Sequence, residues 1–198
     1  MNNYFQTLKN ARTVIIEMLE DRNYIIDDKF KNIDDETLKH LYYINSYDII
    51  AKNSKNNKIY VKFFSHNKLK PTIIKEYLLN IYDSILEKDK DNIVIILNDK
   101  PTTTIKKILN EFNCEVFEID MLQINITKHA LVPKHELADD AEINQLIKKY
   151  NLPSIHKLPI INSNDPVIKY YNFPSNNVCK ITRKSKTSIN HVYYRYIK

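Results

Sequence analysis

Glycine is absent from all 198 residues of this sequence. Glycine adopts positive φ angles without steric cost, and it builds the phosphate-binding loops of P-loop and dinucleotide-binding proteins and the nucleophile elbow of hydrolases. The nucleotide-dependent enzymes of those families are therefore excluded. Asn tolerates the left-handed region next best, and the chain contains 24 Asn. We therefore expect Asn to take these positions, at turns such as Asn56-Asn57 and Asn176-Asn177.

Cysteine is scarce, and long apolar runs are missing. Cys114 and Cys179 lie far apart and outside any C-x-x-C spacing, which favours buried small side chains in a reduced protein over a zinc site. The longest aliphatic run, Ile93 to Leu97, is far shorter than a membrane span. The first residues also lack the basic and apolar regions of a secretion signal. We expect a soluble intracellular protein that does not contact a membrane.

The charge of the chain is unevenly distributed. Residues 1–127 carry 18 Lys and Arg against 19 Asp and Glu, whereas residues 128–198 carry 12 against 5. The net charge of +6 therefore comes from the C-terminal third. A basic region of this kind can face nucleic acid or an acidic protein surface, or it can be an ordinary solvated face. With 43% apolar residues the chain is expected to fold around a packed core.

The N-terminal part has the pattern of an α/β domain, which we expect to span residues 1–122. Apolar residues recur at helical spacing over residues 4–22, and the acids at 34–36 suit the start of a helix over 34–43. Alternation over 46–51 and 58–64 predicts a hairpin. Helices that start at Pro71 and Pro101 then alternate with strands at 93–97 and 115–119, which indicates parallel crossovers. In these two helices we expect inward side chains at Ile74, Leu78, Ile81, Ile85, Ile105, Ile108, Leu109 and Phe112.

Residues 123–198 are organised as a small α+β domain. Asp139 precedes a helix whose expected buried residues are Ile143, Leu146, Ile147 and Tyr150. Residues 158–161 are expected to be short and extended. Asp165 stands directly before Pro166, the pattern of a capped helix start, and Asn172 ends that helix. Strands over 177–183 and 189–197 complete the domain, joined by a polar turn at 184–188.

Two catalytic or metal-binding interpretations find little support in the residues. His129 and His135 lie six residues apart without the further ligands that a metal site needs. Isolated Ser, Cys and His residues show no spacing of a nucleophile and its base. The segment Tyr193-Tyr194-Arg195-Tyr196 mixes aromatic residues with a cation as single-strand nucleic-acid binders do, but it also suits a half-buried strand.

A metal-dependent nuclease is the other enzymatic alternative. Such enzymes need an Asp on one strand and, on the next, a second acid two residues before a Lys, because two carboxylates hold Mg²⁺ while the Lys positions water. Asp48 fits the first position and Lys62 the last. Tyr60 stands where the second carboxylate is required. We therefore predict a nuclease-like layout without an active site.

The C-terminal residues resemble one protein family. The motif H-x-L-V-P-x-H at residues 129–135 is followed by L-P at 158–159, by D-P-x-x-x-Y at 165–170 and by the strand pair K-I-T-R at 180–183 and Y-R at 194–195. In this order and spacing the residues look like the assembly domain of the fifth subunit of eukaryotic RNA polymerases and of its shorter archaeal counterpart. Arg12 and the segment Asp21-Arg22-Asn23-Tyr24-Ile25 are similar to the first helix and following turn of the family's eukaryotic jaw domain.

Most departures from the family pattern are of one kind. Asn stands where the family usually has Gly, at Asn23, Asn164, Asn172 and Asn176, and Lys184 stands where Pro is common. Asn in place of Gly preserves left-handed geometry at modest cost. The glycine-free composition also suggests an AT-rich genome, which we interpret as a version carried by a large DNA virus. Host cytoplasm and virion would then be its location, or the nucleus if it is cellular.

The resemblance implies a non-catalytic subunit of a multisubunit DNA-dependent RNA polymerase, with no cofactor, metal or small-molecule substrate of its own. The C-terminal domain would dock on the largest subunit, beside other polymerase subunits, and the N-terminal domain would form part of the lower jaw, with weak contact to downstream DNA. A stand-alone nucleic-acid-binding module and a divergent nuclease-fold protein are the alternatives. The residues implied in docking are His129, Leu131, Val132, Pro133, His135, Asp165, Pro166, Tyr170, Arg183, Tyr194 and Arg195, of which several can instead hold the domain together.

Overall fold

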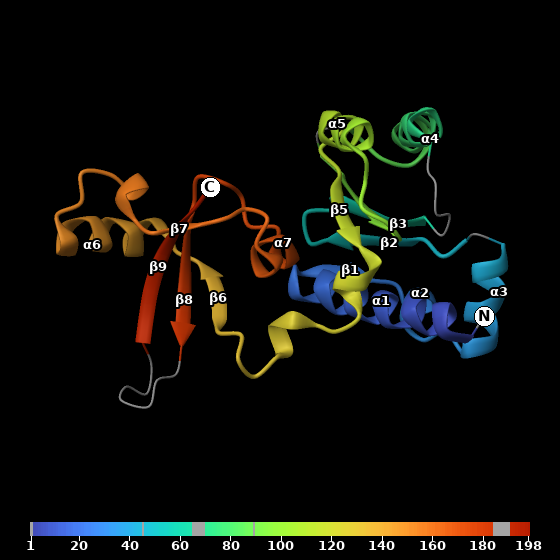
Figure 1. The fold of residues 1–198 in the computed structure, drawn as a ribbon, viewed down its shortest axis with the longest axis horizontal. Coiled ribbons are helices and arrows are strands. Elements are labelled where there is room, and N and C mark those ends of the chain that lie inside the picture. Colours follow the sequence, from blue (N-terminus) through green and yellow to red (C-terminus); the bar gives the residue numbers. More distant parts are fainter. Residues whose placement is uncertain (1, 45, 65–69, 89, 184–190) are drawn as a thin grey trace. The chain divides into compact units, whose positions relative to one another are not determined.

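The computed structural model describes residues 2–44, 46–64, 70–88, 90–183 and 191–198 as a mixed α/β fold (Figure 1). The chain divides into two compact units, Met1–Ile124 and Asn125–Lys198. Each unit contains its own β-sheet. Within the described residues, every helix is too short or too polar to cross a membrane.

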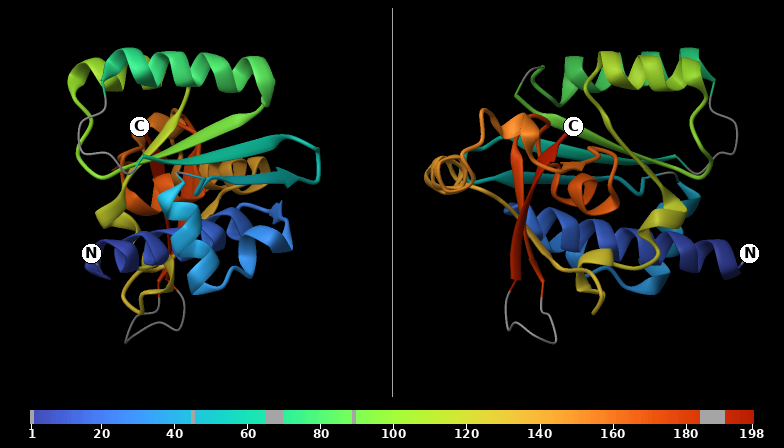
Figure 2. Two further views of the ribbon diagram at one scale, coloured as in Figure 1. Left: turned by 90° about the vertical axis from the view of Figure 1, so that its right-hand side faces the viewer. Right: turned by 60° about the vertical axis from the view of Figure 1, so that its left-hand side comes forward.

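The first unit is a five-stranded sheet in the order β1-β2-β3-β4-β5, with helices on both faces (Figure 2). Strands β1, β2 and β3 pair antiparallel, and β3, β4 and β5 pair parallel. The predicted hairpin and parallel crossovers are therefore confirmed. The elements are α1 (Asn2–Asp21), β1 (Tyr24–Ile26), α2 (Asp28–Lys31), α3 (Asp35–Tyr43), β2 (Ile49–Asn53), β3 (Lys58–Phe64), α4 (Pro71–Ser84), β4 (Asn92–Leu97), α5 (Thr103–Glu111), β5 (Glu115–Glu118) and the 3₁₀ turn η1 (Ile119–Leu122).

Burial on both faces of β4 explains the layers of this unit. Ile93, Ile95 and Leu97 join the core under α4 and α5, while Val94 and Ile96 point to the opposite face. Helices α4 and α5 (green) cover one face of the sheet, and α1, α2 and α3 (blue) lie on the other (Figure 2). The strand predicted at 93–97 is therefore confirmed, and its burial on both faces explains why the run is continuously apolar rather than alternating.

Several predicted boundaries in the first unit are wrong by a few residues. The first hairpin strand is Ile49–Asn53 rather than 46–51, and β5 ends at Glu118. Pro101 does not open α5, because Thr102 is the N-cap and accepts a hydrogen bond from the Ile105 N–H at 3.4 Å. Ile85, expected inside, follows the end of α4 and is 38% exposed.

The second unit is a four-stranded sheet in the order β6-β8-β9-β7, flanked by short helices. Its core gathers Ile168, Cys179, Ile181 and Ile197. The elements are the 3₁₀ turn η2 (Ile126–Lys128), β6 (Lys134–Leu137), α6 (Asp140–Tyr150), the 3₁₀ turn η3 (Ile155–Lys157), β7 (Ile160–Ile161), α7 (Pro166–Tyr171), β8 (Val178–Arg183) and β9 (His191–Ile197). The expected turn at 184–188, with Lys184, and the first two residues of the expected last strand lie outside the described residues.

Helix α6 is less buried than its pattern predicts. Leu146 is buried, Ile143 and Ile147 are half-buried, and Tyr150 is 59% exposed. Asp139 caps the helix by accepting a hydrogen bond from the Glu142 N–H at 2.7 Å. The Glu142 carboxylate does not close a capping box, because it pairs with Lys180 on β8.

Asn replaces Gly at turns, as the composition predicts. Among the described residues the positive φ angles belong to Asn23, Asn56, Asn113, Asn151, Asn172 and Asn176. Asn164, also expected there, is not among them. Asn151 and Asn172 end helices α6 and α7 in the left-handed conformation that usually requires Gly. The absence of glycine therefore leaves the helix ends of the fold intact.

Candidate functional site

The loop before β6 holds a highly exposed residue among those expected to dock. Leu131 is 85% exposed. Its backbone N–H donates to the His129 Nδ1 at 3.2 Å, and the Val132 N–H donates to the His129 carbonyl at 2.9 Å. Val132 and Pro133 are half-buried at the base of the loop. His129 therefore fixes a tight turn that presents an apolar side chain to the outside.

His135 lies on β6, opposite Ile181 of β8. Its Nδ1–H donates to the Pro133 carbonyl at 2.8 Å, so the ring fixes the end of the same loop. The side chain is half-buried. The first motif thus contributes exposed His129 and half-buried His135, whose hydrogen bonds hold the loop in shape, and one leucine that points outward.

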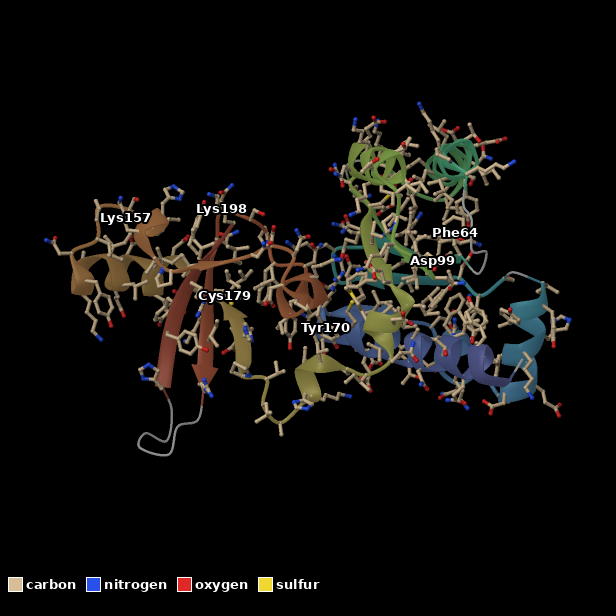
Figure 3. All side chains as sticks on the ribbon, viewed as in Figure 1. Phe64, Asp99, Lys157, Tyr170, Cys179 and Lys198 are labelled. Carbon is tan, nitrogen blue, oxygen red and sulfur yellow. The ribbon has the colours of Figure 1, made fainter. Side chains whose placement is uncertain are left out.

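Asp165, Pro166 and Tyr170 serve the fold of α7. The Asp165 carboxylate accepts from the Val167 N–H at 2.9 Å, and Pro166 occupies the first turn. Tyr170 is 3% exposed, and its hydroxyl accepts a hydrogen bond from the Asn125 Nδ2 at 3.0 Å (Figure 3). These side chains hold α7 and the start of the unit, while the loop at Leu131 is exposed.

The remaining expected residues are spread over the sheet. Arg183 is exposed at the end of β8, in register with His191. Arg195 is half-buried, and its Nη1 donates to the Ile160 carbonyl at 3.2 Å. Tyr194 is in register with Lys180, and Cys179 beside them is fully buried (Figure 3). Arg183 therefore shares the end of the sheet where β6 begins, whereas Tyr194 and Arg195 lie further along.

Sequence reasoning missed strand β6 itself. Lys134 is exposed and pairs with Glu136 at 2.7 Å on the same face of the strand. The signal was the alternation of charged Lys134 and Glu136 with His135 and Leu137. The strand contributes an exposed cation next to the Leu131 loop.

The tyrosines of β9 are used within the sheet. Tyr193 packs against the core of the second unit. Tyr196 is 6% exposed, contacts the His156 ring edge to face at 4.7 Å, and its hydroxyl donates to the Asn176 Oδ1 at 2.5 Å. The packing of Tyr193 and the burial of Tyr196 therefore favour the half-buried strand interpretation of residues 193–196.

A second polar cluster lies in the first unit, around Asp48. The Asp48 Oδ2 accepts hydrogen bonds from the Tyr60 hydroxyl and from the Lys62 Nζ at 2.9 Å, and the Tyr77 hydroxyl lies 3.5 Å away. Tyr60 and Tyr77 contact each other at 3.1 Å between hydroxyl oxygens. The three residues of the nuclease alternative thus converge, joined by Tyr77 of α4, which sequence reasoning missed.

Burial and donation to a carboxylate keep the phenols of this cluster neutral. Burial, and then the hydrogen bond to Asp48, raise the pKa of Tyr60 far above its usual value, and burial likewise raises that of Tyr77. Burial opposes the charge of Lys62, but the hydrogen bond and the charge of Asp48 outweigh it and raise the pKa of the ammonium. Lys62 therefore supplies the cation that balances Asp48.

The cluster does not have the ligands of a two-carboxylate metal site. A neutral phenol stands where a second carboxylate is needed, and Lys62 occupies the space beside Asp48. Among the described residues, His, Cys, Asp and Glu do not gather in threes around any point that can hold a metal ion. What the geometry supports is an internal ion pair between β3 and the segment before β2.

The family comparison defines the class of the protein. Residues 124–197 match the family described as RNA polymerase Rpb5, C-terminal domain. These are the residues of the four-stranded sheet with its Leu131 loop. The class is therefore that of RNA polymerase subunits.

Relatives extend the similarity to the whole chain. DNA-directed RNA polymerases I, II, and III subunit rpabc1 of Dictyostelium discoideum is 31% identical over 194 residues, which cover 95% of each chain. DNA-directed RNA polymerases IV and V subunit 5B of Arabidopsis thaliana is 29% identical over 195 residues, covering 94% of this chain and 88% of the relative. DNA-directed RNA polymerase subunit Rpo5 of Nitrosopumilus maritimus is 41% identical over 75 residues, 38% of this chain and 89% of that protein. The chain belongs to the family of the fifth subunit of DNA-directed RNA polymerases.

Proposed function

We propose that this chain is a non-catalytic subunit of a multisubunit DNA-dependent RNA polymerase, and that it docks on the largest subunit through residues 125–198. The observation that carries the proposal is the similarity over 95% of the length of an RNA polymerase subunit. Because the aligned region covers nearly all of both chains, the similarity includes both units. This favours a shared role of the whole protein over the sharing of a single domain.

The docking surface is the Leu131 loop together with the neighbouring end of the sheet. Leu131 is the apolar contact, and His129 and His135 hold its loop in shape. Exposed Arg183 adds positive charge at the same end of the sheet, near exposed Lys134, whose ammonium also contacts Glu136. Such a surface suits a partner with an apolar pocket and acidic residues around it. Asp165, Pro166 and Tyr170 support the fold behind this surface.

The first unit is the jaw of this proposal, with a nuclease-like layout and no active site of its own. Support comes from the Asp48 cluster, in which Tyr60 replaces the acid that metal-dependent cleavage needs. The unit would lie near downstream DNA and approach its phosphates weakly. A viral origin, with cytoplasmic and virion location, stays a prediction from composition, and a nuclear location applies to a cellular version.

Co-expression with the largest subunit tests docking. Leu131→Ala should reduce the recovered complex at least fivefold, because the variant loses the exposed apolar contact and keeps the backbone of the loop. Ile25→Ala is the matched control, since Ile25 is 71% exposed in the first unit, and it should leave recovery unchanged. Equal recovery of both variants and the parent chain would show that the Leu131 loop is not part of the docking surface. A nuclease would instead show Mg²⁺-dependent cleavage that Asp48→Ala abolishes.

A further inference from the structure

Strand β6 is an edge of the four-stranded sheet (Figure 1). It pairs antiparallel with β8 in the register His135 with Ile181 and Leu137 with Cys179. The Ala138 N–H donates to the Val178 carbonyl at 3.0 Å, so Ala138 and Val178 form a hydrogen-bonded pair of the ladder. Hydrogen-bonded and non-hydrogen-bonded pairs alternate along an antiparallel ladder. The backbone groups of Glu136 and Lys134 therefore also form hydrogen bonds with β8. His135 and Leu137 therefore turn their backbone N–H and C=O groups away from the sheet.

These outward backbone groups have no partner among the described residues of the chain. The opposite edge of the sheet differs. Strand β7 is two residues long, and the Ile160 carbonyl accepts a hydrogen bond from Arg195 at 3.2 Å. Proteins normally shield edge strands by making them short or by covering them. Within the described residues of the second unit, the sheet follows this rule at β7 but not at β6.

The surroundings of β6 indicate the chemistry of what it binds. Apolar Leu131 is 85% exposed just before the strand, and Leu137 is 42% exposed on it. Lys134, exposed near one end, lies beside Thr182, the neighbour of exposed Arg183. The acids close to the strand are Glu136, which pairs with Lys134, and Asp139 and Asp140 beyond its far end. The edge is therefore apolar and basic at its start, and acidic past its end.

We propose that β6 is the docking strand of this subunit, and that an extended segment of the largest polymerase subunit adds to it as a further strand. The inference rests on the proposed function and specifies how the surface works. Main-chain hydrogen bonds to His135 and Leu137 provide affinity. Apolar side chains of the segment contact Leu131 and Leu137, and its acidic side chains face Lys134 and Arg183.

Proline substitutions distinguish residues of β6 whose N–H groups face outward from residues whose N–H groups bond to β8. Leu137→Pro removes an N–H that β8 does not use, so the fold is retained, since proline is tolerated on the outward side of edge strands. Complex formation with the co-expressed largest subunit falls at least tenfold. Leu137→Ala is the matched control, which truncates the side chain but keeps the N–H, and it costs less than threefold. Glu136→Pro removes a bond to β8 and lowers the melting temperature of the free chain.

Amide hydrogen exchange of the parent chain provides a test that needs no variant. In the free chain the amides of His135 and Leu137 exchange quickly and that of Glu136 slowly. In the assembled polymerase all three are protected, and His135 and Leu137 slow by at least a hundredfold. Assembly with unchanged exchange at His135 and Leu137, or equal effects of Leu137→Pro and Leu137→Ala, overturns strand addition and leaves the proposed function standing. Failure to assemble at all overturns both.

Discussion

Arg22 and Glu115 form a two-pronged ion pair across 93 residues of sequence. The Arg22 Nη1 and Nη2 donate to the two Glu115 carboxylate oxygens at 3.1 and 2.8 Å. Their side chains are 6% and 16% exposed. The pair fastens the turn after α1 to the first residue of β5. The segment after the first helix, which supported the family resemblance, therefore has a structural task in the first unit.

Removing one partner of this pair should be costly. Arg22→Ala leaves a largely buried carboxylate without its counter-charge, so we expect the free energy of unfolding to fall by about 3 kcal/mol. Urea denaturation measures it. Lys9→Ala, which breaks the exposed Lys9–Asp35 pair, should cost less than about 1 kcal/mol. Equal losses for the two variants would contradict the account of Arg22.

At Asn151, where the backbone is left-handed, Gly should be more stabilising than Ala, which is the reverse of their order inside a helix. Asn151 has φ 47° at the end of α6. Asn151→Ala should lower the free energy of unfolding by about 1 kcal/mol, while Asn151→Gly should be nearly neutral. Exposed Asn144 inside the same helix is the control, where Ala should be more stable than Gly by about 1 kcal/mol. The same order of Gly and Ala at both positions would refute the claim that Asn substitutes for Gly.

The Asp48 cluster predicts a loss of stability at alkaline pH. The pKa values of Tyr60, Tyr77 and Lys62 are all raised by the fold. Their contribution is complete below about pH 10, the pKa of these groups in the unfolded chain, and it is lost as the pH rises above that value. Unfolding free energies measured from pH 8 to 11 should therefore decline chiefly above about pH 10. Tyr60→Phe should make the decline shallower, and Tyr43→Phe, at an exposed tyrosine, should not.

The two thiols should be unreactive in the folded chain. Burial raises the pKa of Cys114 to about 12 and that of Cys179 to about 11. At pH 8 little thiolate is present, so alkylation by iodoacetamide should be at least tenfold slower than in urea. Mass spectrometry of the alkylated peptides assigns each thiol separately. Rapid labelling of Cys179 in the folded chain would show that the core around β8 is accessible to the reagent, which contradicts this prediction.

Local signals were sufficient for most elements of the fold. Pro71 and the apolar spacing behind it predicted α4, and Asp165-Pro166 predicted α7, because caps and periodicity depend on neighbours in sequence. The helix start predicted at Pro101 is wrong because a neighbouring residue provides a stronger local signal. The Thr102 hydroxyl next to it is the better cap, and it moved the helix start by two residues.

Non-local pairing limited the rest. Strand β6 depends on β8, more than forty residues later, and its four residues carry too short a pattern to predict alone. The sequence placed Tyr60 and Lys62 on a strand and Asp48 close to the neighbouring one, but the contribution of Tyr77 required the packing of α4 on the sheet. Among the expected docking residues, burial separates Tyr170 from Leu131, and spacing in the sequence could not.

Purification of the tagged chain from its native source, with mass spectrometry of the proteins recovered with it, tests whether the chain is a polymerase subunit. We expect stable recovery of the two largest polymerase subunits. Replacing Leu131, Val132 and Pro133 by Ala should abolish that recovery while the chain stays folded. Recovery of the chain alone from intact material at low salt would contradict its assignment as a polymerase subunit.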